Sequence, residues 1–460
     1  MGHNMRITDL LDKNSISLNA APADKKETLD LAVELMAKSG KLSDVEKYRE
    51  QVYAREEEST TGIGERFMSY VLRDYQQKAS DAAVSFFNNK AKKTNAIMVL
   101  PTGSGKSLII ADIAARLDGH TLVFQPSKEI LEQNFKKLCS YGILDCSIYS
   151  ASFNSKEISR ITFATIGSVK NHPELFTHFK NIIVDECHLV NPKEGMYKDF
   201  FEAVKCKVLG LTATPYRLSS SRDFGSMLKF ITRTKPHVFS VVIYHVQVST
   251  LLEMGYLAKL NYYPMDKELK KYNGNEFKEC NLKRNSTGAD YTDRSVQKEY
   301  ERIDFYGYLV HIVQRLMNPK AGGKRKGILV FTRFLKEAER LTWSIPGTAI
   351  VSGDTPKKEC EHILEAFKAG EISVVANVGV LTTGFDYPEL DTVVMARPTM
   401  SLAMWYQIVG RAIRPHPSKE CGWIVDLCGN IKRFGEVSDL RLFDSGNGKW
   451  AVFSNGRAIN

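Results

Sequence analysis

A glycine-rich segment over residues 100–107 has the composition and the neighbours of a phosphate-binding loop. It reads LPTGSGKS, follows one apolar run and precedes a helical pattern over 108–117. Glycines let backbone N–H groups approach a phosphate, and the start of a helix adds unpaired donors and a favourable dipole. Lys106 would reach the β- and γ-phosphates of a nucleotide, and the Ser107 hydroxyl would bind Mg²⁺. The strict pattern has glycine where this chain has Leu100, so a glycine-rich turn without a ligand stays the alternative.

Two adjacent carboxylates, Asp185 and Glu186, directly follow the apolar run 182–184. Ligands of open α/β sheets lie at the carboxyl ends of the strands, so these side chains are placed for chemistry on a bound phosphate. Asp185 is predicted to hold Mg²⁺, and Glu186 to orient or deprotonate an attacking water. His188 could couple the nucleotide to a neighbouring domain or make a plain structural hydrogen bond, and the sequence leaves both open.

Short apolar runs bounded by turn residues supply the strands that would position these groups. The candidates are 96–100, 121–124, 161–165, 182–184, 208–211, 328–331, 348–351, 374–377, 393–396 and 423–425. Such runs are typical of strands buried on both faces of a parallel sheet, and helical patterns lie between them. The alternation predicts a doubly wound α/β fold in two sets, which a polar stretch over 267–302 separates.

The composition excludes several classes of protein. With 43% hydrophobic and 25% charged residues, the chain is globular rather than disordered. No apolar run approaches the roughly 18 residues of a membrane-spanning helix. The N-terminus carries no apolar signal segment, so we expect a cytoplasmic protein without membrane contact. The eight cysteines include no CxxC pair, which argues against a zinc finger or a disulfide framework.

The charge distribution favours a polyanionic partner. The formal net charge of the whole chain is +10, although residues 1–66 contain more acidic than basic side chains. The remainder is therefore more strongly basic than the whole, as expected of a domain that binds nucleic acid. Many proteins that bind no polyanion are mildly basic, so charge alone does not decide the question.

Taken with further motifs in the same order, the sequence resembles the superfamily two helicases of the DExH type. The resemblance covers about residues 67–430. The further segments are LRDYQ (72–76), FQPSKE (124–129), ATIGSV (164–169), LTATP (211–215), LVFT (329–332), NVGVLTTGFD (377–386) and QIVGRAIR (407–414). The resemblance implies two tandem RecA-like parallel-sheet domains with an ATP cleft between them, plus a small helical N-terminal segment.

The resemblance assigns the ATP contacts to both domains. Gln76 would read the adenine, and Arg411 and Arg414 would reach the γ-phosphate across the cleft as arginine fingers. The alternative for the two arginines is a place on the surface of an amphipathic helix. ATP and Mg²⁺ are the expected ligands. The residues expected to contact ATP are Arg73, Gln76, Thr102, Gly103, Ser104, Gly105, Lys106, Ser107, Gly384 and Asp386.

The same resemblance predicts a surface that holds a nucleic-acid backbone and a set of residues that couple it to hydrolysis. The expected nucleic-acid contacts are Pro126, Ser127, Thr165, Ser168, Thr332 and Thr382. The expected coupling residues are His188, Thr212, Thr214 and Gln407. Contacts of this kind go to phosphates and would be independent of base sequence.

These expectations describe an ATP-dependent DNA helicase or translocase that moves on, or remodels, branched DNA in repair, recombination or replication. Segments 184–190, 211–218 and 380–388 look most like RadD-type bacterial helicases and related phage proteins, which favours DNA over RNA. A single-stranded DNA-binding or repair protein would be a fitting partner. The alternatives are a non-unwinding translocase of a restriction or defence complex, an RNA helicase, and a binding module with an inactive ATP site.

Residues 5–65 resemble the first part of a fructose-type enzyme IIA domain of the sugar phosphotransferase system. That family carries a phosphoacceptor histidine shortly after this segment, but no histidine lies between His3 and His120 here. We therefore expect no phosphotransfer, and instead an interaction module, a docking helix pair or a fusion artefact. The expected domain boundaries are 1–66, 67–262, 263–305 as a linker or insertion, and 306–460.

Overall fold

The computed structural model describes residues 25–38, 44–58, 70–91, 94–221, 225–263, 275–285, 288–319, 325, 327–381, 387–446 and 448–459. The chain divides into two compact units, Met1–Val71 with Leu138–Leu144, and Leu72–Lys137 with Asp145–Asn460. Each unit is described by itself. Among the described residues, no helix combines the length and the apolar character that crossing a membrane requires.

The first unit contains two helices near the N-terminus, α2 (Lys25–Lys38) and α3 (Val45–Glu58). They contact each other, and Leu29 and Val33, one helical turn apart on α2, are buried. An ion pair between Asp30 and Arg49 joins the two helices. The two helices agree with the small helical N-terminal segment that the sequence predicts.

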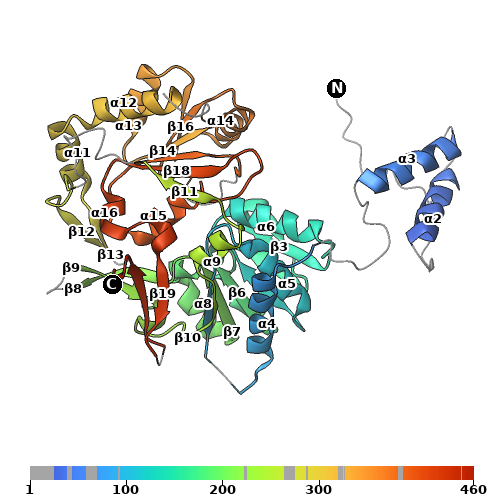
Figure 1. The fold of residues 1–460 in the computed structure, drawn as a ribbon. Helices are drawn as coiled ribbons and strands as arrows, with labels where there is room; N and C mark the ends of the chain where they lie inside the picture. Colours follow the sequence, from blue (N-terminus) through green and yellow to red (C-terminus); the bar gives the residue numbers. More distant parts are fainter. Residues whose placement is uncertain are drawn as a thin grey trace. The chain divides into compact units, whose positions relative to one another are not determined.

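An eight-stranded sheet forms the centre of the first domain of the second unit (Figure 1). The strand order is β10-β1-β7-β6-β2-β5-β3-β4, and every pair except β3–β4 is parallel. The strands are β1 Ala96–Val99, β2 Thr121–Phe124, β3 Cys146–Ser150, β4 Ser155–Lys156, β5 Ile161–Ala164, β6 Asn181–Asp185, β7 Lys207–Thr212 and β10 Val241–His245. The helices are α4 Asp74–Asn88, α5 Lys106–Arg116, α6 Lys128–Ser140, α7 Ile166–Val169, α8 Met196–Val204 and α9 Val248–Glu253.

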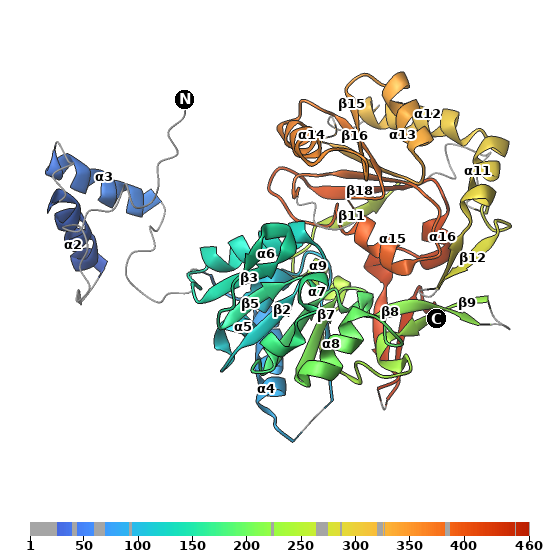
Figure 2. The ribbon, with the colours of Figure 1, turned by 180° about the vertical axis from the view of Figure 1, so that it is seen from behind.

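A six-stranded, wholly parallel sheet forms the centre of the second domain (Figure 2). Its order is β11-β18-β17-β14-β16-β15. The strands are β11 Lys259–Tyr262, β14 Ile328–Thr332, β15 Thr348–Ser352, β16 Val374–Val378, β17 Thr392–Ala396 and β18 Cys421–Asp426. The helices are α11 Asp293–Arg302, α12 Phe305–Met317, α13 Leu335–Ser344, α14 Lys357–Ala369, α15 Leu402–Val409 and α16 Asn430–Phe434.

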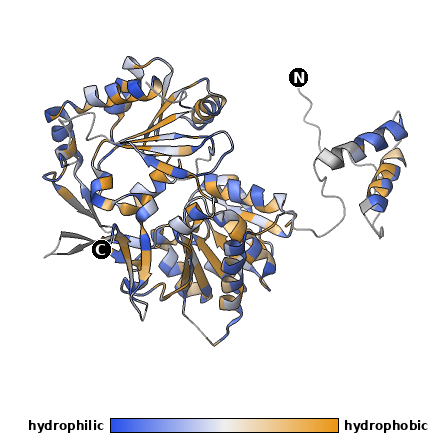
Figure 3. Cartoon of the chain, in the orientation of Figure 1, coloured by the Kyte–Doolittle hydropathy of each residue, from blue (hydrophilic) through white to orange (hydrophobic). Residues whose placement is uncertain are grey.

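Every strand predicted from an apolar run is present, with its ends shifted by at most two residues. Strands β1, β2, β5 and β6 are buried at every position, because helices cover both faces of the sheet. Figure 3 shows hydrophobic residues concentrated in the strands of both sheets. The predicted α/β architecture of two parallel-sheet domains is therefore confirmed.

Residues 263–305 are predicted to be a linker or an insertion, and the residues that the structure describes there are not a linker, while the insertion stays a prediction. They form a hairpin, β12 (Leu282–Asn285) and β13 (Gly288–Tyr291), followed by helix α11. Phe277 and Tyr300 are fully buried in the core of the second domain, where the Tyr300 ring stacks on Phe305 at 4.1 Å between centroids. Aromatic side chains spaced along a polar stretch thus bind it to the core, although the stretch lacks apolar periodicity.

Two predicted boundaries also need correction. Strand β11, placed in the first domain by the boundary at residue 262, pairs in parallel with β18 of the second sheet. The C-terminal strands, placed in the second domain, pack against the first: Trp450 stacks on Phe230, and Gln247 exchanges two hydrogen bonds with the backbone of Leu442. Both shifts follow from pairing and packing between residues far apart in the sequence.

The remaining elements are short. The strands are β8 Tyr216–Ser221, β9 Gly225–Phe230, β19 Arg441–Asp444, β20 Trp450–Ser454 and β21 Arg457–Ala458. The 3₁₀ turns are η2 Ala151–Phe153, η3 Pro173–Phe176, η4 Cys187–Leu189, η5 Ile231–Arg233 and η6 Val437–Asp439. Strands β8 and β9 form a hairpin, and β19 to β21 form a small antiparallel sheet.

Candidate nucleotide-binding site

The predicted phosphate loop connects the end of β1 to the start of α5. Gly103 and Gly105 have φ angles of +83° and +78°, which side chains other than glycine rarely adopt. A Cβ atom at Gly105 would also lie 2.5 Å from the amide nitrogen of Gln76. Helix α5 begins directly at Lys106, so its unpaired N–H groups face the loop.

A cavity of about 380 Å³ joins this loop to the second domain. The cavity brings together most of the residues for which the sequence predicts a role in hydrolysis. Of the predicted residues, Arg73, Thr102, Gly103, Gly105, Lys106, Ser107, Asp185, Glu186, Gln407, Arg411 and Arg414 line it. The two domains meet at its edge, where a Cβ atom on Gly410 would lie 2.8 Å from the Thr102 side chain.

Lys106 and the two carboxylates form the charged centre of the cavity. The Lys106 ammonium pairs with Glu186, and burial, which would lower the pKa of Lys106, is outweighed by Glu186 and Asp185, so the pKa is raised. Burial would raise the pKa of Glu186, but Lys106 and His188 hold it well below the usual range. Burial raises the pKa of Asp185 to about 6, despite the ammonium.

His188 contacts groups from both domains. Its Nδ1 lies 2.9 Å from Thr212 Oγ1 and 3.3 Å from Glu186 Oε2. Thr214 Oγ1 is 3.3 Å from the same nitrogen, and Nε2 lies 3.5 Å from Gln407 Nε2 in the second domain. One ring thus reaches both the acidic pair and the opposite domain, and the coupling role of His188 stays a prediction.

Arg411 and Arg414 lie on the second-domain side of the cavity. Arg411 is buried, and burial lowers its pKa to about 10, so the guanidinium still carries its charge at neutral pH. Burial lowers the pKa of Arg414 as well. Placing these charges in a low-dielectric cavity strengthens their attraction for a polyphosphate.

The predicted adenine-reading segment holds the phosphate loop in place. Gln76 accepts a hydrogen bond from the Arg73 backbone N–H at 3.0 Å and donates one to the Ser104 carbonyl at 2.9 Å. Tyr75 Oη donates to the same carbonyl at 2.7 Å. The Arg73 guanidinium lies 4.1 Å from the ring centroid of Tyr256, which also lines the cavity. The adenine contact of Gln76 stays a prediction.

Asn134 contributes to the site although no motif contains it. Ser107 Oγ donates to Asn134 Oδ1 at 2.7 Å, and Asn134 Nδ2 donates to Gln125 Oε1 at 3.0 Å. Nothing in the sequence marks this residue, because it sits inside a helix of ordinary amphipathic composition. Ser107 and Asp185, the predicted Mg²⁺ ligands, line the same cavity. A hydroxyl and a carboxylate beside a phosphate site form the oxygen donor set that Mg²⁺ prefers, so these residues fit the ion.

The predicted nucleic-acid residues that the structure describes lie at the end of a strand, in the segment that follows it or in helix α7, and some of their side chains already have partners. Thr165 Oγ1 is 3.0 Å from Ser168 Oγ, and Ser127 Oγ accepts from the Ile130 N–H at 3.4 Å. Thr332 is buried, and its hydroxyl donates to the Asn377 carbonyl at 3.3 Å, so its side chain is not accessible to a ligand. Pro126 follows β2. Thr382, Gly384 and Asp386 lie outside the described residues.

Family models match three parts of the chain. The res subunit of type III restriction enzymes matches residues 69–217, and the helicase conserved C-terminal domain matches residues 309–416. The EIIA 2 domain of the phosphoenolpyruvate-dependent sugar phosphotransferase system matches residues 9–69. The matches fall in the order that the motifs predict.

Individual relatives agree with these families. A putative ATP-dependent helicase, IRC3 of Saccharomyces cerevisiae, is 25% identical over 395 residues, which are 78% of this chain and 52% of that protein. The DNA 3'-5' translocase XPB2 of Sulfurisphaera tokodaii is 27% identical over 371 residues, 75% of this chain and 78% of that protein. This chain thus spans about half the length of IRC3.

The fold also has solved counterparts. The ATP-dependent type ISP restriction-modification enzyme LlaBIII bound to DNA aligns with a TM-score of 0.56 and 20% identity, over 77% of this chain and 27% of that chain. The fold and the cavity define a two-domain RecA-like core. With the family matches, this core belongs to the superfamily two helicases, and an enzyme IIA segment precedes it. The finer RadD-type assignment stays a prediction.

Proposed function

We propose that this protein is an ATP-dependent motor that moves along DNA or remodels branched DNA. The observation that carries the proposal is the cavity in which Lys106 and Glu186 of one domain face Arg411 and Arg414 of the other. A site divided between two domains makes hydrolysis depend on their arrangement. Each cycle of ATP binding and release can therefore change how the domains sit on a strand.

The first domain holds the triphosphate and prepares the attacking water. Lys106 binds the β- and γ-phosphates, which then replace Glu186 as its ionic partner and leave that carboxylate to orient the water. Ser107 and Asp185 would hold Mg²⁺, which would supply positive charge to offset the negative charge of the phosphates. Asn134 orients the Ser107 hydroxyl through its hydrogen bond.

The second domain supplies the positive charge that the transition state needs. Arg411 and Arg414 contact the γ-phosphate, because their planar guanidinium groups match phosphate oxygens. Gln407 near His188 links this helix to the acidic pair, so loss of the γ-phosphate changes contacts of both domains. The nucleotide contacts predicted for Gly384 and Asp386 belong to the same proposal.

DNA is the proposed substrate. The XPB2 relative is named a DNA translocase, and the structural counterpart LlaBIII was solved with DNA. The basic net charge of +10 supports binding to a polyanion. Pro126, Ser127, Thr165 and Ser168 lie in the segments that follow β2 and β5 of the first domain, where hydroxyl and backbone groups can bind phosphates without reading bases.

A translocase that does not unwind duplexes is the second candidate, favoured by the matched restriction-enzyme family. An RNA helicase is a third. We place the protein in the cytoplasm and expect a single-stranded DNA-binding or repair protein as partner. The enzyme IIA segment, without its phosphoacceptor histidine, would act as an interaction module.

One set of assays separates these functions. ATPase rates are measured with single-stranded DNA, duplex DNA, forked DNA and RNA, together with strand displacement on the fork. The proposal expects DNA to stimulate ATPase more than RNA, with the fork unwound. Stimulation by duplex without strand displacement would favour the translocase, and preferential stimulation by RNA would overturn the choice of DNA.

A further inference from the structure

Two β-hairpins, one from each domain, meet away from the nucleotide cavity. Strand β8 of the hairpin β8–β9 contacts strand β13 of the hairpin β12–β13. Figures 1 and 2 draw the two hairpins next to each other from opposite sides. We call the pair the hairpin bridge. Each of its hairpins is fastened to its own domain by one arginine.

Arg217 fastens the first hairpin to the acidic segment. Its Nε donates to the carbonyl of His188 at 2.6 Å, and its Nη2 donates to the same oxygen. The imidazole of His188 in turn lies 3.3 Å from the Glu186 carboxylate. Two donors from one planar group fix direction as well as distance, so β8 moves with the backbone of His188.

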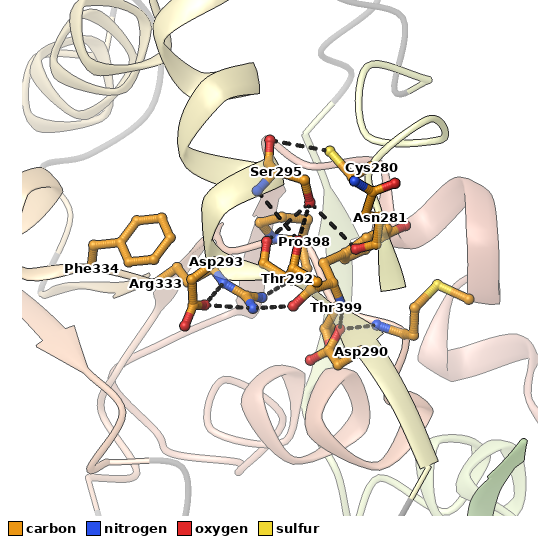
Figure 4. Close-up of polar contacts among 12 residues, drawn as sticks. Cys280, Asn281, Asp290, Thr292, Asp293, Ser295, Arg333, Phe334, Pro398 and Thr399 are labelled. Carbon is orange, nitrogen blue, oxygen red and sulfur yellow. Dashed lines mark hydrogen bonds and ion pairs between the residues drawn. The ribbon is translucent and has the colours of Figure 1, made fainter. Parts of the chain in front are cut away.

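Arg333 fastens the second hairpin to the end of β14. Only 7% of its side chain is exposed. Its Nη2 donates to the Tyr291 carbonyl at 2.6 Å and its Nε to Asp293 Oδ1 at 2.9 Å, and Figure 4 shows the guanidinium beside Asp293. Nη1 donates to the Pro398 carbonyl at 3.3 Å. Arg333 therefore joins β13 and α11 to segments that follow two central strands.

Asp290 adds a second connection at the base of the same hairpin. Its Oδ1 accepts hydrogen bonds from the backbone N–H groups of Tyr291 at 2.8 Å and Met400 at 3.0 Å. Thr399 Oγ1 donates to Oδ2 at 3.4 Å (Figure 4). The base of β12–β13 is thus held at several points on the second domain and cannot turn independently of it.

We propose that Arg217 and Arg333 are positioning residues of one linkage, which connects His188 beside the acidic pair to the end of β14 through the hairpin bridge. The linkage rests on the proposed motor function. Through it, a change of ligand in the nucleotide site would alter the position of the segments that follow the strands of the second domain. It runs apart from the arginine fingers, which touch the nucleotide directly. The alternative is that each arginine stabilises only its own domain.

Hydrogen exchange of the intact protein tests the linkage without requiring any activity. In Arg217→Gln, amides of 288–302 in the other domain should exchange at least about threefold faster than in the wild type. In Arg333→Gln, amides of 216–221 should do the same. Arg160→Gln is the matched control, because Arg160 also donates to two backbone carbonyls of the first domain but lies outside the bridge. It should leave 288–302 unchanged.

Exchange that rises only within the domain carrying the substitution would overturn the linkage. Should a glutamine variant fail to fold, Arg217→Lys and Arg333→Lys keep one donor and should give smaller changes in the same segments. Unchanged exchange across the bridge in the folded lysine and glutamine variants would equally contradict it.

A double variant adds a functional readout. Each glutamine substitution should lower the stimulation of ATPase by DNA about tenfold, and the double variant should lower it no further. The two effects should not add, because both substitutions interrupt the same linkage. A loss in the double variant equal to the product of the single losses would show two independent effects and overturn the linkage. Absence of DNA stimulation in the wild type would instead refute the proposed motor, while the exchange result still decides the linkage.

Discussion

Glu186 combines a strained backbone conformation with a largely buried, charged side chain. Its φ and ψ angles are both 49°, a left-handed conformation that is uncommon for glutamate, and its carboxylate pairs with Lys106. Strain of this kind persists where the surroundings hold a group in one orientation. The orientation of its carboxylate is therefore set before any substrate binds.

We expect Glu186→Gln to lower the ATP turnover rate by at least about 10²-fold, because an amide cannot accept the proton of the attacking water. Lys106→Ala should remove turnover by removing the phosphate contact. Steady-state ATPase assays measure both, with circular dichroism to check that the fold is intact. Turnover at the wild-type rate in either folded variant would refute the role assigned to that residue.

Arg411→Ala should spare ATP binding and lower hydrolysis by roughly 10³–10⁵-fold, as expected of an arginine finger. Binding is measured by fluorescence of a labelled nucleotide and hydrolysis in single turnover. Arg411→Lys is the control that keeps the charge without the planar fork. A loss of ATP affinity as large as the loss of rate would argue for contact in the ground state.

Sequence reasoning found the residues that local motifs carry and missed those that only the fold brings in. Lys106 and Asp185 stand in recognisable runs beside strands. Contacts between residues distant in the sequence bring three more residues to the site: Asn134 contacts Ser107, Tyr256 contacts Arg73, and Arg217 contacts His188. No local spacing encodes such contacts.

At the scale of elements, helix α13 contains a fully buried acid. Glu337 accepts a hydrogen bond from the Phe334 N–H at 3.3 Å, and burial raises its pKa to about 7. The folded state therefore binds its proton more tightly than the unfolded chain, and stability is lost as pH rises toward 7. The ionised carboxylate costs on the order of 3 kcal/mol above that pH.

Glu337→Gln should remove this dependence. Relative to the variant, the wild type should lose stability between about pH 5 and pH 8, because only the wild type must ionise a buried group. Thermal unfolding at both values of pH measures the difference. Parallel changes in the two proteins would show that Glu337 does not titrate in this range.

Trp450→Ala should destabilise the first domain, although the tryptophan follows the second domain in the sequence. Its ring packs on Phe230 and meets His245 at 4.9 Å between centroids. Truncating a buried tryptophan costs roughly 3–5 kcal/mol. Chemical unfolding measures the loss, and Trp450→Phe should recover part of it. No change in stability would mean that the C-terminal sheet is not docked.

The central strands were predictable because short uninterrupted apolar runs are typical of strands that are buried on both faces of a sheet. Strands β3, β10 and β11 lie toward the sheet edges and are partly exposed, so their runs mix polar and apolar residues. The hairpin β12–β13 is largely polar, and β8–β9 contains no long apolar run. Their places depend on anchors such as Arg333, which no pattern of hydrophobicity reveals.

At the scale of the whole molecule, the basic charge predicts how DNA binding responds to salt. Affinity for single-stranded DNA should fall steeply between about 50 and 200 mM salt, as for proteins that release counterions from phosphates. Strands of unrelated sequence should bind equally, because backbone contacts carry no base readout. Fluorescence anisotropy measures both. A salt slope near zero would contradict binding through phosphates.

The two-domain architecture followed from the order of the motifs, but the path of the chain between the domains did not. The chain enters the second sheet at β11 and returns to the first domain with β19 to β21. These returns depend on pairing with β18 and on packing around Trp450, which are fixed only in the folded molecule.

This double passage has a consequence for proteolysis. A protease that cuts the backbone between α9 and β11 severs one covalent connection between the two domains. The C-terminal segment around Leu442 stays hydrogen-bonded to Gln247 of the first domain. The nicked molecule should run as a single species on a native gel and as two bands in detergent.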